Sequence, residues 1–379
     1  MSKFLLILLS LVFYTMFKAW QMWPGHRLVA ISLVVPLFFL MIGWMFIFRS
    51  YPSLFHSTWF YTLALVGSVL MGIWGAFIIF SIPVDVVHLV VFLVRKFSQQ
   101  AHDPDRRQFI SNTFRMSLVG VSAGIGAMGL IQVMSGARVK KVSISHSKLP
   151  QNLKNLTIAQ ISDLHVGTTI RQGYVSEVVE KTNALNPDLI FITGDLADGK
   201  MSDLEQHLAP LGNLQSKYGV YYITGNHEYY WGALSQIETC KSLGFIPLIN
   251  ENRVIDINGS KLMIAGVTDP VAEQMMIEHT PNLPKAIESF ELVDFKILLA
   301  HRPDTIIEAE PLGFDLQFSG HTHSGQFFPF NLLLPLAHKY YRGLNHHGNM
   351  QVYVNAGTGY WGPPNRFAIP SEISHITLS

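Results

Sequence analysis

Long apolar runs fill the first 135 residues, whereas short apolar runs alternate with polar segments in the rest of the chain. A helix needs about 20 apolar residues to cross the hydrocarbon core of a bilayer. Runs of this kind cover Leu28–Phe48, Trp59–Ile82 and Met116–Met134, and Phe4–Phe17 is a shorter candidate. Residues 1–135 are therefore predicted to form a multi-span α-helical membrane region of about four helices. The alternative, helices buried in a large soluble core, would require protein to surround each span on every side.

The segment Pro83–Val94 is also apolar, but it carries Asp85 and His88. Two interpretations stay open: a kinked continuation of the preceding helix, or a segment lying at the membrane surface. Ionisable side chains inside a membrane region mark transport pathways, and the long spans before Pro83 contain none. This pattern favours an anchor over a transporter.

The Lys and Arg content of the short loops predicts the orientation, because cytoplasmic loops are enriched in these residues. The counts are Lys18 and Arg27 in the first loop, Arg49 in the second, and Arg95, Lys96, Arg106, Arg107 and Arg115 in the third. Placing the third loop in the cytoplasm puts the C-terminal part of this integral membrane protein on the extracytoplasmic side, although Arg138–Lys141 opposes this. Arg106-Arg107 also resembles a twin-arginine export signal, and a basic cytoplasmic loop explains it equally well.

The second part of the chain alternates strand-like and helix-like segments. Strands are expected at Leu156–Ile161, Leu189–Thr193, Val220–Thr224, Lys261–Val267, Phe295–Ala300, Leu316–Phe318 and Val352–Asn355, and helices at Val175–Leu185 and Leu234–Leu243. Such alternation is typical of a layered α/β domain. The domain is expected at residues 156–379, joined to the membrane region by a linker at 136–155 in which Val142 and Ile144 could begin a strand.

Composition narrows the chemistry. Charged residues make up 14% of the 379 residues and apolar residues 49%, which agrees with a chain partly in lipid. The formal net charge of +1 gives no reason to expect a nucleic-acid partner. Cys240 is the only cysteine, so an intramolecular disulfide and a Cys-rich zinc site are excluded. Any metal must therefore be held by His, Asp, Asn and Glu.

Five polar motifs follow five of the expected strands. They are Asp163-Leu164-His165, Gly194-Asp195-Leu196-Ala197-Asp198, Gly225-Asn226-His227-Glu228, the single His301, and Gly320-His321-Thr322-His323. Ligands bind at the carboxyl ends of strands in α/β sheets, so the five motifs are expected to converge. Each motif alone is weak, since Asp-x-His or Gly-Asp occurs in ordinary turns. Their order and shared chemistry together predict a metal centre.

These motifs resemble those of the calcineurin-like metallophosphoesterases, over roughly Leu156 to the C-terminus. The resemblance implies a four-layer α/ββ/α sandwich and two divalent metal ions. It implies that one metal is held by Asp163, His165, Asp195 and His323, and the other by Asp195, Asn226, His301 and His321. Asp195 would bridge the pair.

The physics agrees with this ligand set. Two cations about 4 Å apart need a bridging carboxylate, and they lower the pKa of a shared water so that a hydroxide can attack phosphorus. His, Asp and Asn ligands admit Mn²⁺, Fe, Zn²⁺ or Co²⁺. His227 is left free to protonate the leaving group or to stabilise the transition state. The resemblance implies that Asp198 orients it, while a turn or helix cap is the alternative role for Asp198.

Departures from the family pattern concern the substrate. The protein-phosphatase branch has arginines where Gly199 and Thr224 stand here, which argues against a phosphoprotein substrate. The chain instead resembles a membrane-linked bacterial-type branch that includes phosphodiesterases ending in a Gly-Thr-Gly and Pro-rich stretch. Arg366 follows such a stretch here, and it is expected either to bind substrate phosphate or to be a structural surface residue.

An aromatic and apolar stretch follows His323. It includes Phe327, Phe328, Phe330, Leu332–Leu334, Tyr340 and Tyr341. The aromatic residues Tyr229–Trp231 could contribute to the same apolar surface. It is expected to be either a core hairpin or an apolar lip that admits a lipid tail.

The function expected is a membrane-anchored phosphohydrolase acting on a phosphodiester, pyrophosphate or phosphomonoester, with a lipid-linked substrate favoured by the anchor. The alternative is a transporter or receptor whose phosphoesterase-like domain regulates the membrane part. A catalytically dead binding domain is disfavoured, because such domains lose ligands and this chain keeps all seven.

Overall fold

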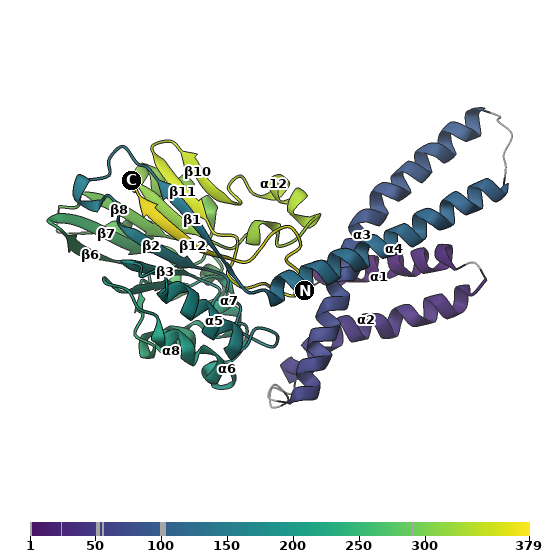
Figure 1. The fold of residues 1–379 in the computed structure, drawn as a ribbon, viewed down its shortest axis with the longest axis horizontal. Helices are drawn as coiled ribbons and strands as arrows, with labels where there is room; N and C mark the ends of the chain where they lie inside the picture. The colour runs from purple at the N-terminus through teal and green to yellow at the C-terminus, as the bar shows by residue number, and fades with distance from the viewer. Residues whose placement is uncertain (1, 24, 51–53, 55–56, 99–103, 290–291) are drawn as a thin grey trace. The chain divides into compact units, whose positions relative to one another are not determined.

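The computed structural model describes residues 2–23, 25–50, 54, 57–98, 104–289 and 292–379, which form two compact units. The first unit comprises Met1–Ile131 and the loop Gly362–Asn365, and the second comprises Gln132–Trp361 and Arg366–Ser379. Figure 1 traces the chain through both units.

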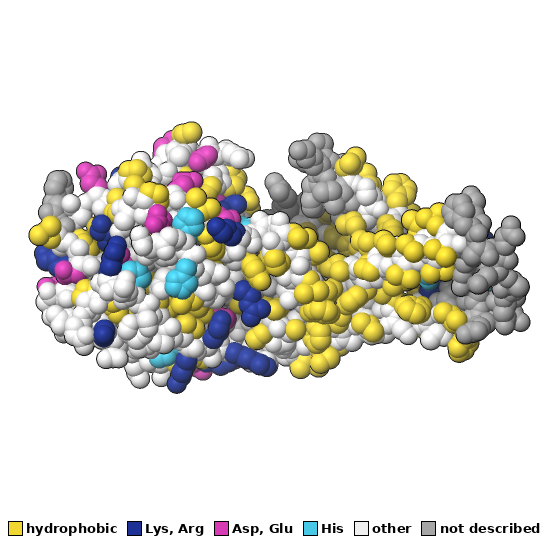
Figure 2. Space-filling model, turned by 90° about the horizontal axis from the view of Figure 1, so that it is seen from above, with side chains coloured by type: hydrophobic (Ala, Val, Ile, Leu, Met, Phe, Trp, Pro, Cys, Tyr) yellow, Lys and Arg dark blue, Asp and Glu magenta, His cyan; other side chains and the backbone are white. Residues whose placement is uncertain are grey.

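Four long helices make up most of the first unit. They are α1 (Ser2–Met22), α2 (Arg27–Ser50), α3 (Thr58–Ser98) and α4 (Pro104–Met134). Among the residues described, stretches of α2, α3 and α4 are long and apolar enough to cross a membrane, and α1 is not one of these three. Apolar side chains cover most of the visible face of this unit in Figure 2.

The helix bounds decide one expectation for the membrane region and leave another open. Helix α3 runs through Pro83, so Pro83–Val94 continues the preceding helix. Arg106 and Arg107 lie in the first turn of α4, but their side chains are outside the described residues. The structure therefore does not address the twin-arginine interpretation.

Lys18 is not a loop residue, which corrects the sequence analysis. It lies in the last turns of α1 with its side chain almost fully buried, and its Nζ is 2.6 Å from Asp85 Oδ1 on α3. Tyr14 donates a hydrogen bond of 2.6 Å to the other oxygen of Asp85. The helical unit thus contains an ion pair between a buried lysine and a partly buried aspartate. The two residues lie far apart in the sequence, so the sequence did not reveal the pair.

The loop Gly362–Asn365 packs against two glycines of the helices. A Cβ atom at Gly129 would lie 1.7 Å from Asn365 Oδ1, and one at Gly72 would lie 3.1 Å from Pro363 Cβ. The close approach at Gly129 therefore requires a residue without a side chain.

The second unit contains two six-stranded sheets. The first has the order β1 (Arg138–Ile144), β12 (Glu372–Leu378), β2 (Thr157–Ile161), β3 (Leu189–Thr193), β4 (Val220–Ile223) and β5 (Ile246–Pro247). Strands β2 to β5 are parallel, and β12 runs antiparallel to β2 while pairing in parallel with β1. Strand β1 lies inside the segment expected to be a linker, so residues 136–155 are partly sheet.

The second sheet has the order β10 (Gly343–His347), β11 (Met350–Val354), β9 (Leu316–Ser319), β8 (Phe295–Leu299), β7 (Ser260–Gly266) and β6 (Glu251–Ile257). Its four central strands are parallel, and the two edge strands are antiparallel to their neighbours. The parallel strands in each sheet place their carboxyl ends at one edge, where the motifs follow.

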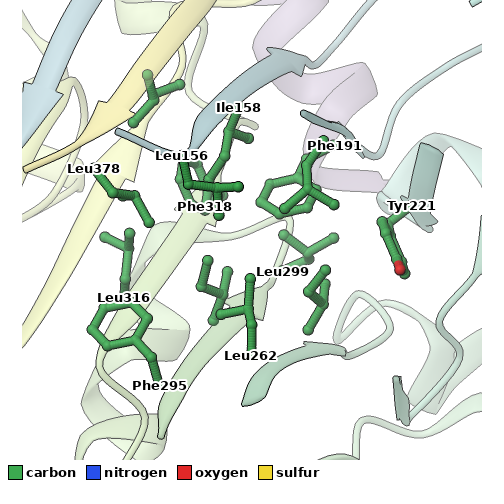
Figure 3. Packing of buried hydrophobic residues seen from close by; sticks show 14 of the residues in the cluster. Leu156, Ile158, Phe191, Tyr221, Leu262, Phe295, Leu299, Leu316, Phe318 and Leu378 are labelled. Carbon is green, nitrogen blue, oxygen red and sulfur yellow. The ribbon is translucent and has the colours of Figure 1, made fainter. Parts of the chain in front are cut away.

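The main core lies between the two sheets. Ile158 and Phe191 of the first sheet face Leu299 and Phe318 of the second, and all four are fully buried (Figure 3). The rings of Phe191 and Phe318 pack edge to face at 5.2 Å. Burial from both sides explains why these strands read as continuous apolar runs.

Helices cover the outer faces. Figure 1 shows α5 (Gln172–Asn183), α6 (Met201–Leu208) and α8 (Ala233–Ser242) beside the first sheet. On the second sheet, α10 (Leu283–Ile287) and α11 (Ile306–Ala309) pack buried residues against β7, β8 and β11. Three further short helices are α7 (Asn226–Trp231), α9 (Ala272–Met275) and α12 (Leu334–Ala337). The expected four-layer α/ββ/α sandwich is confirmed.

Candidate metal centre

The five motifs occupy loops at the carboxyl ends of parallel strands, as expected. Asp163, Asp195 and Asn226 directly follow or lie just beyond β2, β3 and β4 of the first sheet. His301 follows β8, and His321 and His323 follow β9 of the second. Both sheets therefore contribute ligands to one edge of the sandwich.

The backbone at these loops is held in an unusual conformation. Positive φ angles near 50–70° occur at Asp163, His165, Asp195, His321 and His323. Non-glycine residues rarely adopt this region, and each one costs about 1 kcal/mol or more unless its surroundings impose it. Such strain is typical of functional loops, where the required side-chain position outweighs the energetic cost of the backbone conformation.

Two glycines allow the loops to meet. A Cβ at Gly320 would lie 1.9 Å from Ser162 Oγ and 2.1 Å from Asp163 Oδ2. A Cβ at Gly225 would lie 2.3 Å from Asp195 Oδ1. Glycine is therefore required where the loop after one strand crosses that after another.

Asp163, His165 and His323 form the first candidate metal-binding group. The Nε2 atoms of the two histidines are 3.0 Å apart, and His323 Nε2 is 3.4 Å from Asp163 Oδ1. Both oxygens of Asp163 accept from the backbone N–H of His321, at 3.0 and 3.1 Å. All three ligand candidates are buried.

Asp195, His301 and His321 form another group, and Asp195 also belongs to a third group with His165 and His227. His301 Nε2 lies 3.2 Å from Asp195 Oδ2 and 3.3 Å from His321 Nδ1. His301 Nδ1 donates to the carbonyl of Thr193 at 2.8 Å, which leaves its Nε2 lone pair directed at the centre. Asp195 Oδ2 is also 3.9 Å from His165 Nε2, so this carboxylate lies between the two groups.

Asn226 gives an independent indication that a cation fits. Its Oδ1 is buried and has no hydrogen-bond partner among the described residues. A buried amide oxygen without a partner is costly unless a ligand completes it. The electrostatics agree: although burial disfavours the imidazolium, Asp195 raises the pKa of His301 to about 10. In contrast, burial and the charge of His301 lower the pKa of His321 to about 2.

Asp198 contacts two histidines with different roles. Its carboxylate lies 3.1–3.2 Å from His165 Nδ1 and 2.6 Å from His227 Nδ1. Although burial opposes ionisation, His165 and His227 hold the pKa of Asp198 well below its usual range. Although burial also disfavours charge on His227, Asp198 raises the pKa of His227 to about 9. Asp198 therefore contacts one imidazole of a candidate metal ligand and the imidazole of His227.

Glu228 is a site residue that sequence reasoning did not single out. Its carboxylate is fully buried and accepts from the backbone N–H groups of Asp195, Leu196 and Gly225, at 3.0, 2.8 and 2.6 Å. It thereby ties the loop after β3 to the loop after β4. Its position in the third motif was the available signal, but its partners on the other loop were not predictable.

Arg366 is fully buried, so it is not a surface residue. Its guanidinium donates to the carbonyls of Ala356, Gly357, Gly359 and His323. It also faces His323 Nδ1 at 3.1 Å, a pair in which only the guanidinium can donate. Unlike His165 and His301, His323 thus turns its second nitrogen toward a donor, and metal binding at Nε2 would require the ring proton to leave that atom.

Exposed aromatic side chains flank His227. The Tyr230 ring is 5.3 Å and the Trp361 ring 6.0 Å from the imidazole, and these side chains are 51% and 55% exposed. The aromatic stretch after His323 has both buried residues, as a core hairpin would, and exposed residues, as an apolar lip would. Phe327 and Tyr340 are buried, whereas Phe330, Leu332, Leu333 and Leu336 are exposed.

Comparison with known proteins identifies the family. Residues 156–325 match the family model described as calcineurin-like phosphoesterase. An uncharacterized metallophosphoesterase of Helicobacter pylori is 36% identical over 277 residues, which cover 73% of each chain. A transmembrane protein with metallophosphoesterase domain of Danio rerio is 33% identical over 71% of this chain and 64% of its own. The metallophosphoesterase YkuE of Bacillus subtilis is 28% identical over 72% of this chain and 97% of its own.

The shared family and the clustered side chains agree, since the family is metal-dependent and acts on phosphoesters. The three apolar helices add that this is a membrane protein. By sequence, fold and site, the chain belongs to the metallophosphoesterase family.

Proposed function

We propose that the protein is a membrane-anchored dinuclear phosphohydrolase that cleaves a phosphodiester, pyrophosphate or phosphomonoester bond. The observation that carries this proposal is the position of Asp195, between two groups of candidate ligands and beside His227. One metal would be held by Asp163, His165, Asp195 and His323. The other would be held by Asp195, Asn226, His301 and His321.

Two bound divalent cations would supply an activated water at neutral pH and would neutralise charge on the phosphoryl oxygens. A residue of the chain would supply the proton for the leaving group. His227 Nδ1 donates to Asp198, which leaves Nε2 as the atom that carries a proton toward the site. His227 is buried except for a small fraction, so its proton is available to a leaving oxygen and little exposed to bulk water.

Hydrolysis of bis-p-nitrophenyl phosphate by the purified full chain, after reconstitution with Mn²⁺, tests the proposal. Asp195→Ala is expected to lower turnover at least 1000-fold and to reduce bound metal from two ions per chain. Asp203→Ala, in the first turn of α6 away from the site, is the matched control and should retain full activity. Unchanged turnover in Asp195→Ala would refute the dinuclear mechanism.

A lipid-linked substrate is the class that we propose to test first. Phe330, Leu332, Leu333 and Leu336 form an exposed apolar group after the last two ligands, with Leu336 85% exposed. Exposed apolar groups of this kind mark interaction sites. Tyr230 and Trp361 offer an apolar rim next to His227 for the leaving group.

Leu332→Ser with Leu336→Ser tests the lipid link. The double variant should lose at least tenfold in kcat/KM on a phospholipid-type phosphodiester presented in mixed micelles, while its turnover of soluble bis-p-nitrophenyl phosphate stays unchanged. If the double variant keeps the wild-type kcat/KM on the phospholipid substrate, the lipid proposal is refuted and the phosphohydrolase proposal is unaffected.

The site is proposed to face the extracytoplasmic side. This orientation depends on the basic residues at the end of α3 and the start of α4 and on α4 as the last span, so it does not depend on whether α1 crosses the membrane. The first loop lies on the same side as the third in this topology, so placing Lys18 inside α1 reduces the support that the first loop gives.

A second candidate function gains from the Lys18–Asp85 pair. An ionisable pair among membrane helices is a recognised feature of transport pathways, and here Asp85, which follows the uncharged spans before Pro83, pairs with Lys18. Uptake or efflux measured in vesicles with Asp85→Asn tests a transporter. Flux that depends on Asp85 but not on Asp195 would favour this function over a simple anchor.

A further inference from the structure

A cavity of ≈ 360 Å³ opens among the helices of the first unit. All four helices contribute to its wall, which is almost entirely apolar; Val34 and Met41 of α2 and Phe77 of α3 are examples. Its volume lies within the range of small-molecule sites, about 300–1000 Å³, and apolar walls with a few polar groups are typical of such sites. The residues that line the cavity belong to the first unit, whereas the residues of the candidate metal centre all belong to the second.

The polar groups in the wall divide into two kinds. The hydroxyls of Thr15 and Ser122 donate to carbonyls one turn earlier in their own helices, so they hold no ligand of their own. Lys18 and His26 are the basic residues in the wall, at the end of α1 and in the turn that leads to α2. The charged end of the cavity is therefore near the α1–α2 turn.

Lys18 retains capacity to bind an anion. Its ammonium has three hydrogens, and one is directed at Asp85 Oδ1. The side chain is only 8% exposed, so its charge is little screened by solvent. On another side, Lys18 lines a smaller hollow together with His88 and Arg115. Two cationic side chains, Lys18 and Arg115, therefore lie in the lining of this hollow.

The charge balance favours an anionic ligand. Asp85 is the single acidic residue in the first 101 residues, and it is already paired with Lys18 and Tyr14. Arg27 and the remaining Lys and Arg residues of that stretch have no acidic residue there to match them. A phosphate-bearing head group would supply the missing negative charge.

We propose that this cavity binds one anionic membrane phospholipid, with a hydrocarbon chain between the helices and its phosphate near Lys18 and His26. The apolar wall excludes a purely polar ligand, because polar groups in it would lack partners. The surrounding bilayer supplies the lipid directly. This site is separate from the proposed catalytic centre and does not depend on its chemistry.

Native mass spectrometry of the full chain, released from detergent micelles, tests the proposal. Delipidated protein is titrated with phosphatidylglycerol or with phosphatidylcholine of the same chains. One phosphatidylglycerol per chain should be retained, at least tenfold more strongly than phosphatidylcholine. Equal retention of the two lipids would overturn the anionic head-group site.

Two neighbouring substitutions in α2 provide a matched pair. Val34 lines the cavity and is 7% exposed, whereas Val35 faces outward and is 40% exposed. Val34→Phe should lower phosphatidylglycerol retention at least tenfold, and Val35→Phe should leave it unchanged. Equal retention in the two variants would refute binding in this cavity.

Thermal unfolding in detergent gives a second measurement that detects misfolding. Phosphatidylglycerol should raise the Tm of the wild type and of Val35→Phe but not that of Val34→Phe. If Val34→Phe is not folded without lipid, Ala30→Leu, also in the wall, takes its place. The charge-removing pair Lys18→Gln with Asp85→Asn should abolish the preference for phosphatidylglycerol, and a preserved preference would contradict the assigned head-group end.

Discussion

Asp198 binds the second nitrogen of two histidines, one that is a candidate metal ligand and one that is a candidate acid. A carboxylate at this nitrogen fixes the imidazole tautomer and its ring orientation. Because the same side chain does this for His165 and His227, the metal site and the proton donor are aligned by one residue. The resemblance to the family implied the contact with His227, whereas the contact with His165 emerged only from the fold.

Asp198→Asn is expected to lower kcat by about 100-fold or more for a substrate with an alkyl leaving group, since general acid catalysis contributes about that much. The loss should be much smaller with p-nitrophenolate as the leaving group, which departs without a proton. Metal content, measured by plasma mass spectrometry, should fall only modestly. An equal loss on both leaving groups would show that Asp198 does not act through His227.

Arg366→Met tests whether this arginine supports the loops or grips phosphate. The substitution leaves buried carbonyls at Ala356, Gly357 and Gly359 without a donor, which should cost about 3 kcal/mol or more of stability. A markedly lower Tm in detergent is therefore expected. A raised KM with an unchanged Tm would instead indicate direct contact with the substrate.

At the scale of elements, strands with apolar residues on both faces were predictable to within one or two residues. Strand β3 was expected at Leu189–Thr193 and is found there. Strand β12 was not predicted and β1 was anticipated only at Val142 and Ile144, because basic and polar residues interrupt both strands and each pairs with the other across the length of the chain. Strands β5, β6 and β10 were also not predicted. Sequence reasoning placed the ligand loops well, because each loop directly follows a strongly apolar strand.

The same logic explains the missed residues of the site. Glu228 and Arg366 act on backbone groups of other loops, and such long-range contacts leave no local pattern. Lys18 and Asp85 were likewise assigned separately, because an ion pair between helices has no sequence spacing to reveal it.

Gly320→Ala tests the crossing of two ligand loops. The added Cβ would meet Ser162 and Asp163 at about 2 Å, so the loop after β9 must move away from the loop after β2. Metal content and turnover should both fall at least 100-fold. Gly173→Ala in α5, where a Cβ meets no atom within 4 Å, is the control and should behave as wild type or be slightly more stable. Full activity in Gly320→Ala would contradict the close crossing.

For the whole molecule, the lone cysteine makes the proposed orientation measurable. Cys240 is buried, so the wild type should not react with a membrane-impermeant maleimide. Ser242 lies at the exposed end of α8, and Ser242→Cys should be labelled in intact cells if the second unit is extracytoplasmic. Labelling that appears only after cell lysis would place the site in the cytoplasm and reverse the proposed topology.

The loop Gly362–Asn365 has a practical consequence for anyone who wishes to produce the catalytic part alone. The second unit begins at Gln132, so a fragment starting there is the obvious choice. Such a fragment would still carry this loop but would lack Gly72 and Gly129, against which the loop packs. Trp361 and Arg366 flank this loop. A change in the loop's conformation would therefore displace Trp361, which packs beside His227, and Arg366, which contacts His323. Expression of the isolated domain therefore calls for a redesigned polar connection between these two residues, not for truncation alone.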